Sequence, residues 1–110
     1  MNIIKIKFTA TTAVIRDDKL TLTPELFCEI DDDNGGTLNL AYTMDPDNEL
    51  GVELITTSDT ENLTQIETTF DKTINFRRKA GNNTKGSFKL IVTGTIGGTS
   101  ETGRLHVNYK

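Results

Sequence analysis

The chain has 110 residues, a formal net charge of −4 and a single cysteine, Cys28. A chain of this length predicts one domain over residues 1–110, because two smaller domains could not each bury a stable core without staples. One cysteine excludes an internal disulfide and a metal site built on several thiolates. The negative charge argues against general affinity for nucleic acid, which requires a basic face.

The N-terminal segment does not read as a secretion signal, because Lys5 and Lys7 interrupt its apolar run. No later stretch approaches the roughly 18 apolar residues that a membrane span requires. We therefore expect a protein that is made and folded in the cytoplasm and has no membrane partner.

Apolar and polar residues alternate along most of the chain, and many of the polar positions are filled by its nineteen threonines. A strand directs successive side chains to opposite faces, so this pattern buries one face and exposes the other. Threonine suits the exposed face because its β-branch favours extended backbone while its hydroxyl tolerates water. The alternation predicts an all-β sandwich.

Strands are expected in chain order wherever the alternation continues between turn residues. They are Ile3–Phe8, a hairpin of Thr12–Arg16 and Lys19–Thr23 turned by Asp17 and Asp18, Glu25–Asp31, Thr37–Met44, residues 50–54, Thr73–Arg78, Ser87–Thr95 and Thr102–Tyr109. The predicted inward rows are Ile4, Ile6 and Phe8; Ala13 and Ile15; Leu20 and Leu22; Leu26, Cys28 and Ile30; Leu38, Leu40, Tyr42 and Met44; Leu50, Val52 and Leu54; Ile74 and Phe76; Phe88, Leu90 and Val92; and Leu105, Val107 and Tyr109.

Residues 58–71 allow two interpretations. Leu63, Ile66 and Phe70 have near-helical spacing, and Ser58 or Asp59 could cap a short helix. The four threonines of the stretch are poor helix formers, so a strand or an irregular crossover is favoured. About seven to nine short strands in two antiparallel sheets are expected in all.

Catalytic chemistry is not indicated. Nucleophilic catalysis usually needs a histidine base, and His106 is the only histidine, on the expected outer face of the last strand. We predict that the protein is not an enzyme and binds no cofactor or metal. The acidic turns Asp31–Gly36 and Asp45–Glu49 could offer oxygen ligands to calcium, but they are expected at opposite ends of one strand, roughly 25 Å apart.

Positive charge is concentrated in one predicted turn, which carries Arg77, Arg78, Lys79 and Lys85. This basic turn could bind a phosphate or an acidic partner, or could simply be solvated. No aromatic residue is interleaved for base stacking, which disfavours single-stranded nucleic acid. Acidic turns set against a basic turn suggest a charge-polar molecule that could orient copies or dock on an oppositely charged surface.

The C-terminal third resembles the last two strands of an immunoglobulin-like domain of the bacterial and phage kind. The residues concerned are Gly86-Ser-Phe-Lys-Leu-Ile-Val-Thr-Gly94, the glycine-rich segment Gly94–Gly103, predicted as a mobile loop, and Gly103-Arg-Leu-His-Val-Asn-Tyr109. Domains of that kind lack the disulfide of antibody domains, as this chain does.

This resemblance implies a single immunoglobulin-like β-sandwich that works by surface contact, as do the auxiliary capsid (decoration) proteins and other virion proteins of tailed phages. Its partner would be a capsid or other virion protein lattice, and its location the virion. The implied contact elements are the basic turn at Arg77, Arg78 and Lys79, the N-terminal strand, and the glycine-rich loop with Gly97, Gly98 and an exposed Ile96. The alternative is an adhesion or carbohydrate-binding module on a cell surface or fibre.

Overall fold

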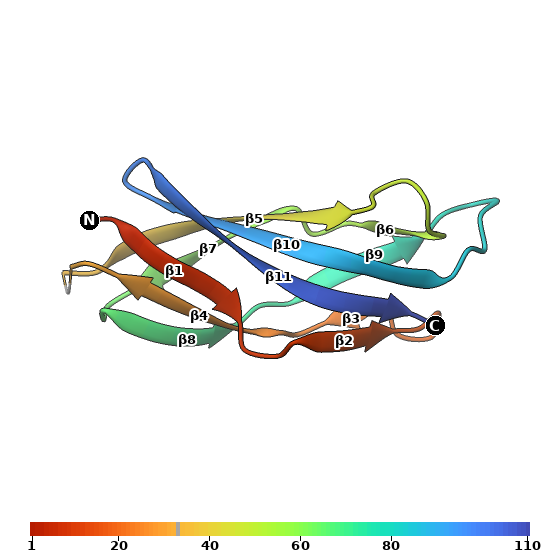
Figure 1. The fold of residues 1–110 in the computed structure, drawn as a ribbon, viewed down its shortest axis with the longest axis horizontal. Coiled ribbons are helices and arrows are strands. Elements are labelled where there is room, and N and C mark those ends of the chain that lie inside the picture. Colours follow the sequence, from red (N-terminus) through yellow and green to blue (C-terminus); the bar gives the residue numbers. More distant parts are fainter. Residues whose placement is uncertain (33) are drawn as a thin grey trace.

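The computed structural model describes residues 1–32 and 34–110, and every regular element in these residues is a β-strand. The strands form an elongated, sandwich-like body with extents of 48 × 22 × 17 Å (Figure 1). The prediction of an all-β fold is confirmed. Within the described residues, no helix has the length and apolar character needed to cross a bilayer.

One layer is a five-stranded sheet. Its order is β2 (Thr12–Ile15), β11 (Thr99–Tyr109), β10 (Gly86–Ile96), β5 (Gly36–Asp45) and β7 (Ser58–Leu63). Neighbouring strands are antiparallel, except that β2 runs parallel to β11. The long hairpin of β10 and β11 crosses the molecule diagonally, and its tip lies at the same end of the molecule as the N-terminus (Figure 1).

The other layer consists of two three-stranded sheets that continue one another. One has the order β1 (Ile3–Phe8), β4 (Glu25–Ile30) and β8 (Glu67–Asp71); the other has the order β3 (Thr21–Leu22), β9 (Ile74–Arg78) and β6 (Val52–Leu54). Two residues separate β3 from β4, and two separate β8 from β9. The Lys72 N–H donates to the Pro24 carbonyl across this joint at 3.2 Å. Pro24 has no N–H to return that bond, so the ladder is interrupted there.

The segment between β5 and β8 contributes to both layers. β6 pairs with β9 in the second layer, and after residues 55–57 the chain continues as β7, which pairs with β5 in the first. Residues 58–71 therefore form β7 and β8, and the predicted preference for strand over helix is confirmed. The described residues form eleven strand segments, more than the predicted seven to nine; residues 58–71, predicted as one segment, contribute two of them.

The core lies between the layers and contains the apolar rows of both. Phe76 of β9 meets Phe88 of β10 edge-on, with ring centroids 5.6 Å apart. Cys28 is 1% exposed, as expected of a small buried hydrophobe, and burial raises the pKa of its thiol to about 11. The predicted inward rows are buried or half-buried throughout, with one exception in β1.

The exception is Ile4, which was predicted to face inward but is 49% exposed. The pairing of β1 with β4 shifts between Ile3 and Lys5, and this bulge turns Ile3 into the core in place of Ile4.

The predicted hairpin of residues 12–23 is also wrong in its pairing. Only Arg16 and Lys19 bridge its two arms. β2 continues along β11 in one layer, whereas β3 continues along β9 in the other. Alternation predicted which side chains are inward, namely Ile15 and Leu22, but not that the two arms belong to different layers.

Candidate functional site

The basic turn lies at the end of the molecule that holds the C-terminus. Its side chains form contacts with other residues of the same chain. Arg77 Nε lies 2.5 Å from Glu53 Oε1. Arg78 Nε lies 3.6 Å from Asp17 Oδ1, and Lys79 Nζ donates to the Asp47 carbonyl at 3.3 Å. Both arginine side chains remain more than half exposed, at 67% and 53%. The turn can therefore touch a partner, but internal acceptors already balance much of its charge.

Asp17 is the centre of the largest of these clusters. Lys85 Nζ lies 2.7 Å from Asp17 Oδ2, and the Tyr109 hydroxyl donates to Asp17 Oδ1. Lys85 also sits over the Tyr109 ring, 3.9 Å from its centroid. The hydrogen bond from Lys85, followed by that from Tyr109, lowers the pKa of Asp17, and the same Asp17 contact raises the pKa of Lys85. The cluster ties the turn after β2 to the C-terminal end of β11 and to the basic turn.

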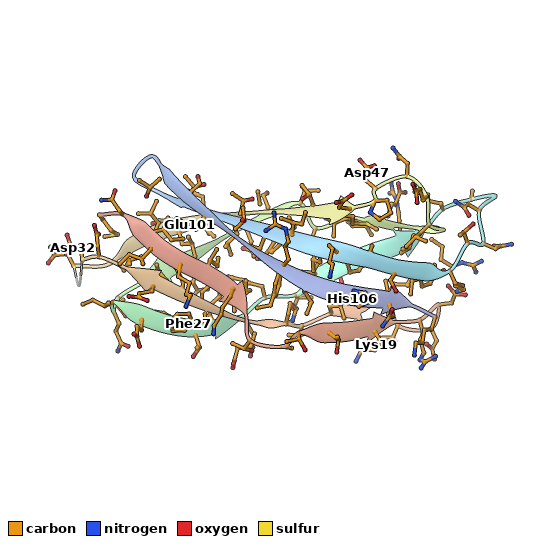
Figure 2. All side chains as sticks on the ribbon, in the orientation of Figure 1. Lys19, Phe27, Asp32, Asp47, Glu101 and His106 are labelled. Carbon is orange, nitrogen blue, oxygen red and sulfur yellow. The ribbon has the colours of Figure 1, made fainter. Side chains whose placement is uncertain are left out.

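The second acidic turn lies at this same end. The Gly51 N–H donates to the Thr84 carbonyl at 2.8 Å, and the Lys79 N–H donates to the Gly51 carbonyl at 2.9 Å. Asp32 lies at one end of the long axis and Asp47 lies in the other half of the molecule (Figure 2), so the two acidic turns are at opposite ends of β5, as predicted. The predicted opposition of acidic turns to a basic turn is thus wrong for residues 45–49, which pack beside the basic turn. Asp33 of the other acidic turn lies outside the described residues.

The glycine-rich segment is a strand hairpin rather than the predicted loop. β10 continues to Ile96 and β11 begins at Thr99, so only Gly97 and Gly98 form the turn, with φ of +55° and +87°. Ile96, predicted to be exposed, is 5% exposed and belongs to the core. A Cβ on Gly97 would lie 2.7 Å from the Met1 carbonyl oxygen, so the hairpin tip packs against the N-terminus. Of the three predicted contact residues here, only Gly97 and Gly98 are at the surface.

A shallow cleft of about 250 Å³ opens where the chain crosses from β6 to β7. It is lined by Tyr42, Thr43, Met44, Asp47, Glu53, Leu54 and Thr57. The Tyr42 hydroxyl has no hydrogen-bond partner in the described part of the chain, and burial raises its pKa well above the ordinary value, with smaller contributions from Asp59 and Glu61. The cleft brings no histidine, cysteine or lysine together with these groups.

Residues 1–32 and 34–110 contain no group of three histidine, cysteine, aspartate or glutamate side chains placed to hold a metal ion. His106 lies on the outer face of β11, as predicted, with Nδ1 3.4 Å from Lys89 Nζ. Within the part of the chain that the structure describes, neither the cleft beside Tyr42 nor the surroundings of His106 form a catalytic arrangement.

Sequence reasoning missed an acidic surface on β4 and β8. Glu25 lies opposite Asp71, and Glu29 lies opposite Glu67, on the outer face of these strands. None of these four carboxylates makes an ion pair within the described residues. The alternation already placed Glu25 and Glu29 outward, but which strand would pair with β4 could not be read from it.

No protein-family model matches the chain, and a search of curated proteins finds no significant similarity.

Proposed function

We propose that this protein is a non-enzymatic binding protein with an immunoglobulin-like β-sandwich fold, and that it serves as an auxiliary capsid (decoration) protein or another virion protein of a phage. Function follows by analogy with small immunoglobulin-like domains of virions.

The strand order is the observation that carries the proposal. With β3 and β4 taken as one interrupted strand, and β8 and β9 as another, one layer has the order β1, β3/β4, β8/β9, β6. The other has β11, β10, β5, β7. The positions of β1, β3/β4 and β8/β9 correspond to the A, B and E strands of immunoglobulin domains, and those of β11, β10 and β5 correspond to G, F and C. β6 and β7 occupy the D and C′ positions, but they follow one another in the reverse chain order. The parallel pairing of β2 with β11 also supports this arrangement, because it places the N-terminal segment in both layers.

Binding would use the ends and edges of the sandwich. The exposed Gly97–Gly98 tip and the half-exposed Arg77 and Arg78 lie at opposite ends of the long hairpin of β10 and β11, which lets one copy touch two neighbours on a lattice. Repetition over a lattice turns modest single contacts into stable attachment through avidity.

Carbohydrate binding gains no support from the aromatic side chains. Tyr42 and Tyr109, the best candidates for a sugar platform, are each 2% exposed. Phe27 is half-buried on the outer face of β4, with Lys7 Nζ 5.6 Å from its ring centroid (Figure 2). No observation favours the adhesion alternative over the virion proposal.

Quantitative mass spectrometry of purified particles and of the soluble fraction from the same source tests this proposal. We expect copy numbers in particles close to those of the shell subunit. Replacing Arg77 and Arg78 with glutamate should lower particle occupancy without unfolding the domain. Absence of the protein from particles would contradict the proposed function, and unchanged occupancy of the variant would remove the basic turn from the contact.

A further inference from the structure

We infer that the free edge of β8 accepts an extended, positively charged segment of a protein partner as an added strand. The inference rests on the proposed function for the source of that segment, since a binding protein must present a surface that its own chain does not satisfy.

The backbone of β8 leaves one side unpaired. The Ile30 N–H donates to the Ile66 carbonyl, and the Lys72 N–H donates to the Pro24 carbonyl, so the even-numbered residues of this segment point toward β4. Alternation along the strand then directs the N–H and C=O groups of Glu67, Thr69 and Asp71 away from β4. β8 is the outermost strand of its sheet, and these groups have no backbone partner within the described residues. Figure 1 shows β8 at the margin of the molecule.

The side chains on this strand carry unbalanced negative charge. The pairs Glu25–Asp71 and Glu29–Glu67 are of the non-hydrogen-bonded kind, in which side chains come closest, and like charges in such pairs are destabilising. On the same outer face Lys5 of β1 lies opposite Glu29, whereas Glu67 and Asp71 of β8 have only carboxylates opposite them. The free side of β8 therefore offers carboxylates without a cation of its own chain.

Other long edges in the described part of the chain are blocked. On β7 the outward-pointing Thr60 carbonyl accepts a 2.7 Å hydrogen bond from Lys72 Nζ, which also lies 2.8 Å from Glu61 Oε1. On β1 the bulge between Ile3 and Lys5 distorts the edge. Inward charges and bulges of this kind prevent edge-to-edge pairing. By contrast, β8 keeps an unbroken register over all five residues.

The chemistry of the occupant follows from this geometry. A strand added beside β8 places alternate side chains next to Glu67, Thr69 and Asp71 on the outer face. Basic residues four positions apart would meet Glu67 and Asp71, with a neutral residue between them beside Thr69. The two intervening residues would turn inward toward the half-buried Thr68 and Phe70, so small or apolar side chains suit them. Charge complementarity therefore selects a lysine- or arginine-bearing extended segment of a protein.

The test uses two capped peptides, STKVTVKTS and its acidic counterpart STEVTVETS, added to the full-length protein labelled with ¹⁵N at low ionic strength. We expect the lysine peptide at saturation to slow amide exchange of Glu67, Thr69 and Asp71 by about fivefold or more, because new hydrogen bonds protect those groups. High salt should weaken the effect, since these charges are exposed. The acidic peptide should leave all three amides unchanged.

Three variants make the test specific. The E67K/D71K variant should remain folded, refuse the lysine peptide and accept the acidic peptide. Its matched control, D18K/E49K, makes the same change in net charge at exposed turn residues and should bind the lysine peptide like the wild type. Thr69→Pro removes one outward N–H without changing charge and should abolish protection; a thermal melt checks its folding.

Unchanged exchange at Glu67, Thr69 and Asp71 with saturating lysine peptide would overturn the inference. Equal binding by E67K/D71K and wild type would do the same. These outcomes are independent of the particle experiment. If the protein is abundant in particles but does not bind the peptide, only the inference about the β8 edge is contradicted. If it binds the peptide but is absent from particles, only the virion proposal is contradicted.

Discussion

The two outer faces of the sandwich share one alternating pattern and differ in charge. The five-stranded sheet exposes small uncharged side chains over the part of the face toward the hairpin tip. These are Thr37, Asn39 and Ala41 of β5, Ser58, Thr60 and Asn62 of β7, Thr93 and Thr95 of β10, and Ser100 and Thr102 of β11. We call this the neutral face. The outer side of β4 and β8 carries Glu25, Glu29, Glu67 and Asp71, which we call the acidic face.

The neutral face is suited to folding, whereas the acidic face is suited to recognising a partner. Neutral side chains satisfy one another locally: Thr95 Oγ1 lies 2.8 Å from Ser100 Oγ, and Thr37 Oγ1 donates to Asn62 Oδ1 at 3.4 Å. On the acidic face, opposing carboxylates repel each other, which costs folding free energy. Binding of a positively charged partner would relieve this repulsion and so contribute favourable binding free energy. The acidic face is therefore the better candidate for recognition.

The largest effect is expected in the core, where the two layers should be equivalent. Leu26 of β4 and Leu90 of β10 are both fully buried, each 0% exposed. Leu26→Ala and Leu90→Ala should each lower the free energy of unfolding by about 3 kcal/mol, through lost apolar burial and the cavity left behind. Urea denaturation measures both. A loss below about 1 kcal/mol for either one would show that its layer contributes little to the common core.

A smaller effect is expected at the blocked edge. The Lys72 side chain is 15% exposed and contacts Glu61, Asp59 and the Thr60 carbonyl. Lys72→Met should lower the free energy of unfolding by about 1 kcal/mol, because it leaves these acceptors without their cation. Lys79→Met, which removes one 3.3 Å contact to a carbonyl, is the control and should cost less. Equal losses in urea denaturation would contradict a special role for Lys72 at the edge of β7.

Reversing charge on the acidic face should be stabilising. The E67K/D71K variant converts two like-charge pairs into opposite-charge pairs and should raise the free energy of unfolding by about 0.5–1 kcal/mol. On the neutral face, Thr93 lies opposite Thr102, and T93K/T102K introduces a like-charge pair there, with a small expected loss. Thermal melts of the two variants compare the faces. Destabilisation by E67K/D71K would mean that the carboxylates make favourable contacts within the fold.

Substitution of Asp17 should have the smallest effect on stability at neutral pH and a clear effect on stability in acid. Its pKa is below the ordinary value of 3.8 because of Lys85 and Tyr109, so its stabilising contribution is present above about pH 4 and is lost as pH falls through the lowered pKa. The raised pKa of Lys85 makes the partner contribution complete below 10.5 and lost at higher pH. Asp17→Asn should reduce the acid dependence of the melting temperature. If the melting temperature of Asp17→Asn falls in acid as steeply as that of the wild type, the Asp17–Lys85 ion pair does not stabilise the fold.

Sequence reasoning predicted the elements of this fold better than their partners. Strict alternation in β4, β5, β10 and β11 identified their buried rows, because burial on one face forces a period of two. It failed at Ile4, where a bulge shifts the register, and at Ile96, where glycines taken as a loop continue a hairpin. Both positions depend on non-local packing: β1 takes its register from β4, and the turn after Ile96 packs on the N-terminus, where a Cβ on Gly97 would lie 2.7 Å from the Met1 carbonyl oxygen.

The candidate site shows the same limit. The basic turn was visible as a run of charge, but its internal partners Glu53 and Asp17 are distant in sequence. The acidic face was invisible, because Glu25 and Asp71 become neighbours only when β4 pairs with β8.

Residue-resolved amide exchange of the free protein tests the central claim, an open acidic edge on β8, without any partner. We predict rapid exchange for Glu67, Thr69 and Asp71 and slow exchange for Thr68 and Phe70, whose N–H groups face β4. That alternation would establish three unpaired donors beside unbalanced carboxylates. Slow exchange at all five residues would contradict the account, because it would mean that the edge of β8 is already covered by the protein itself.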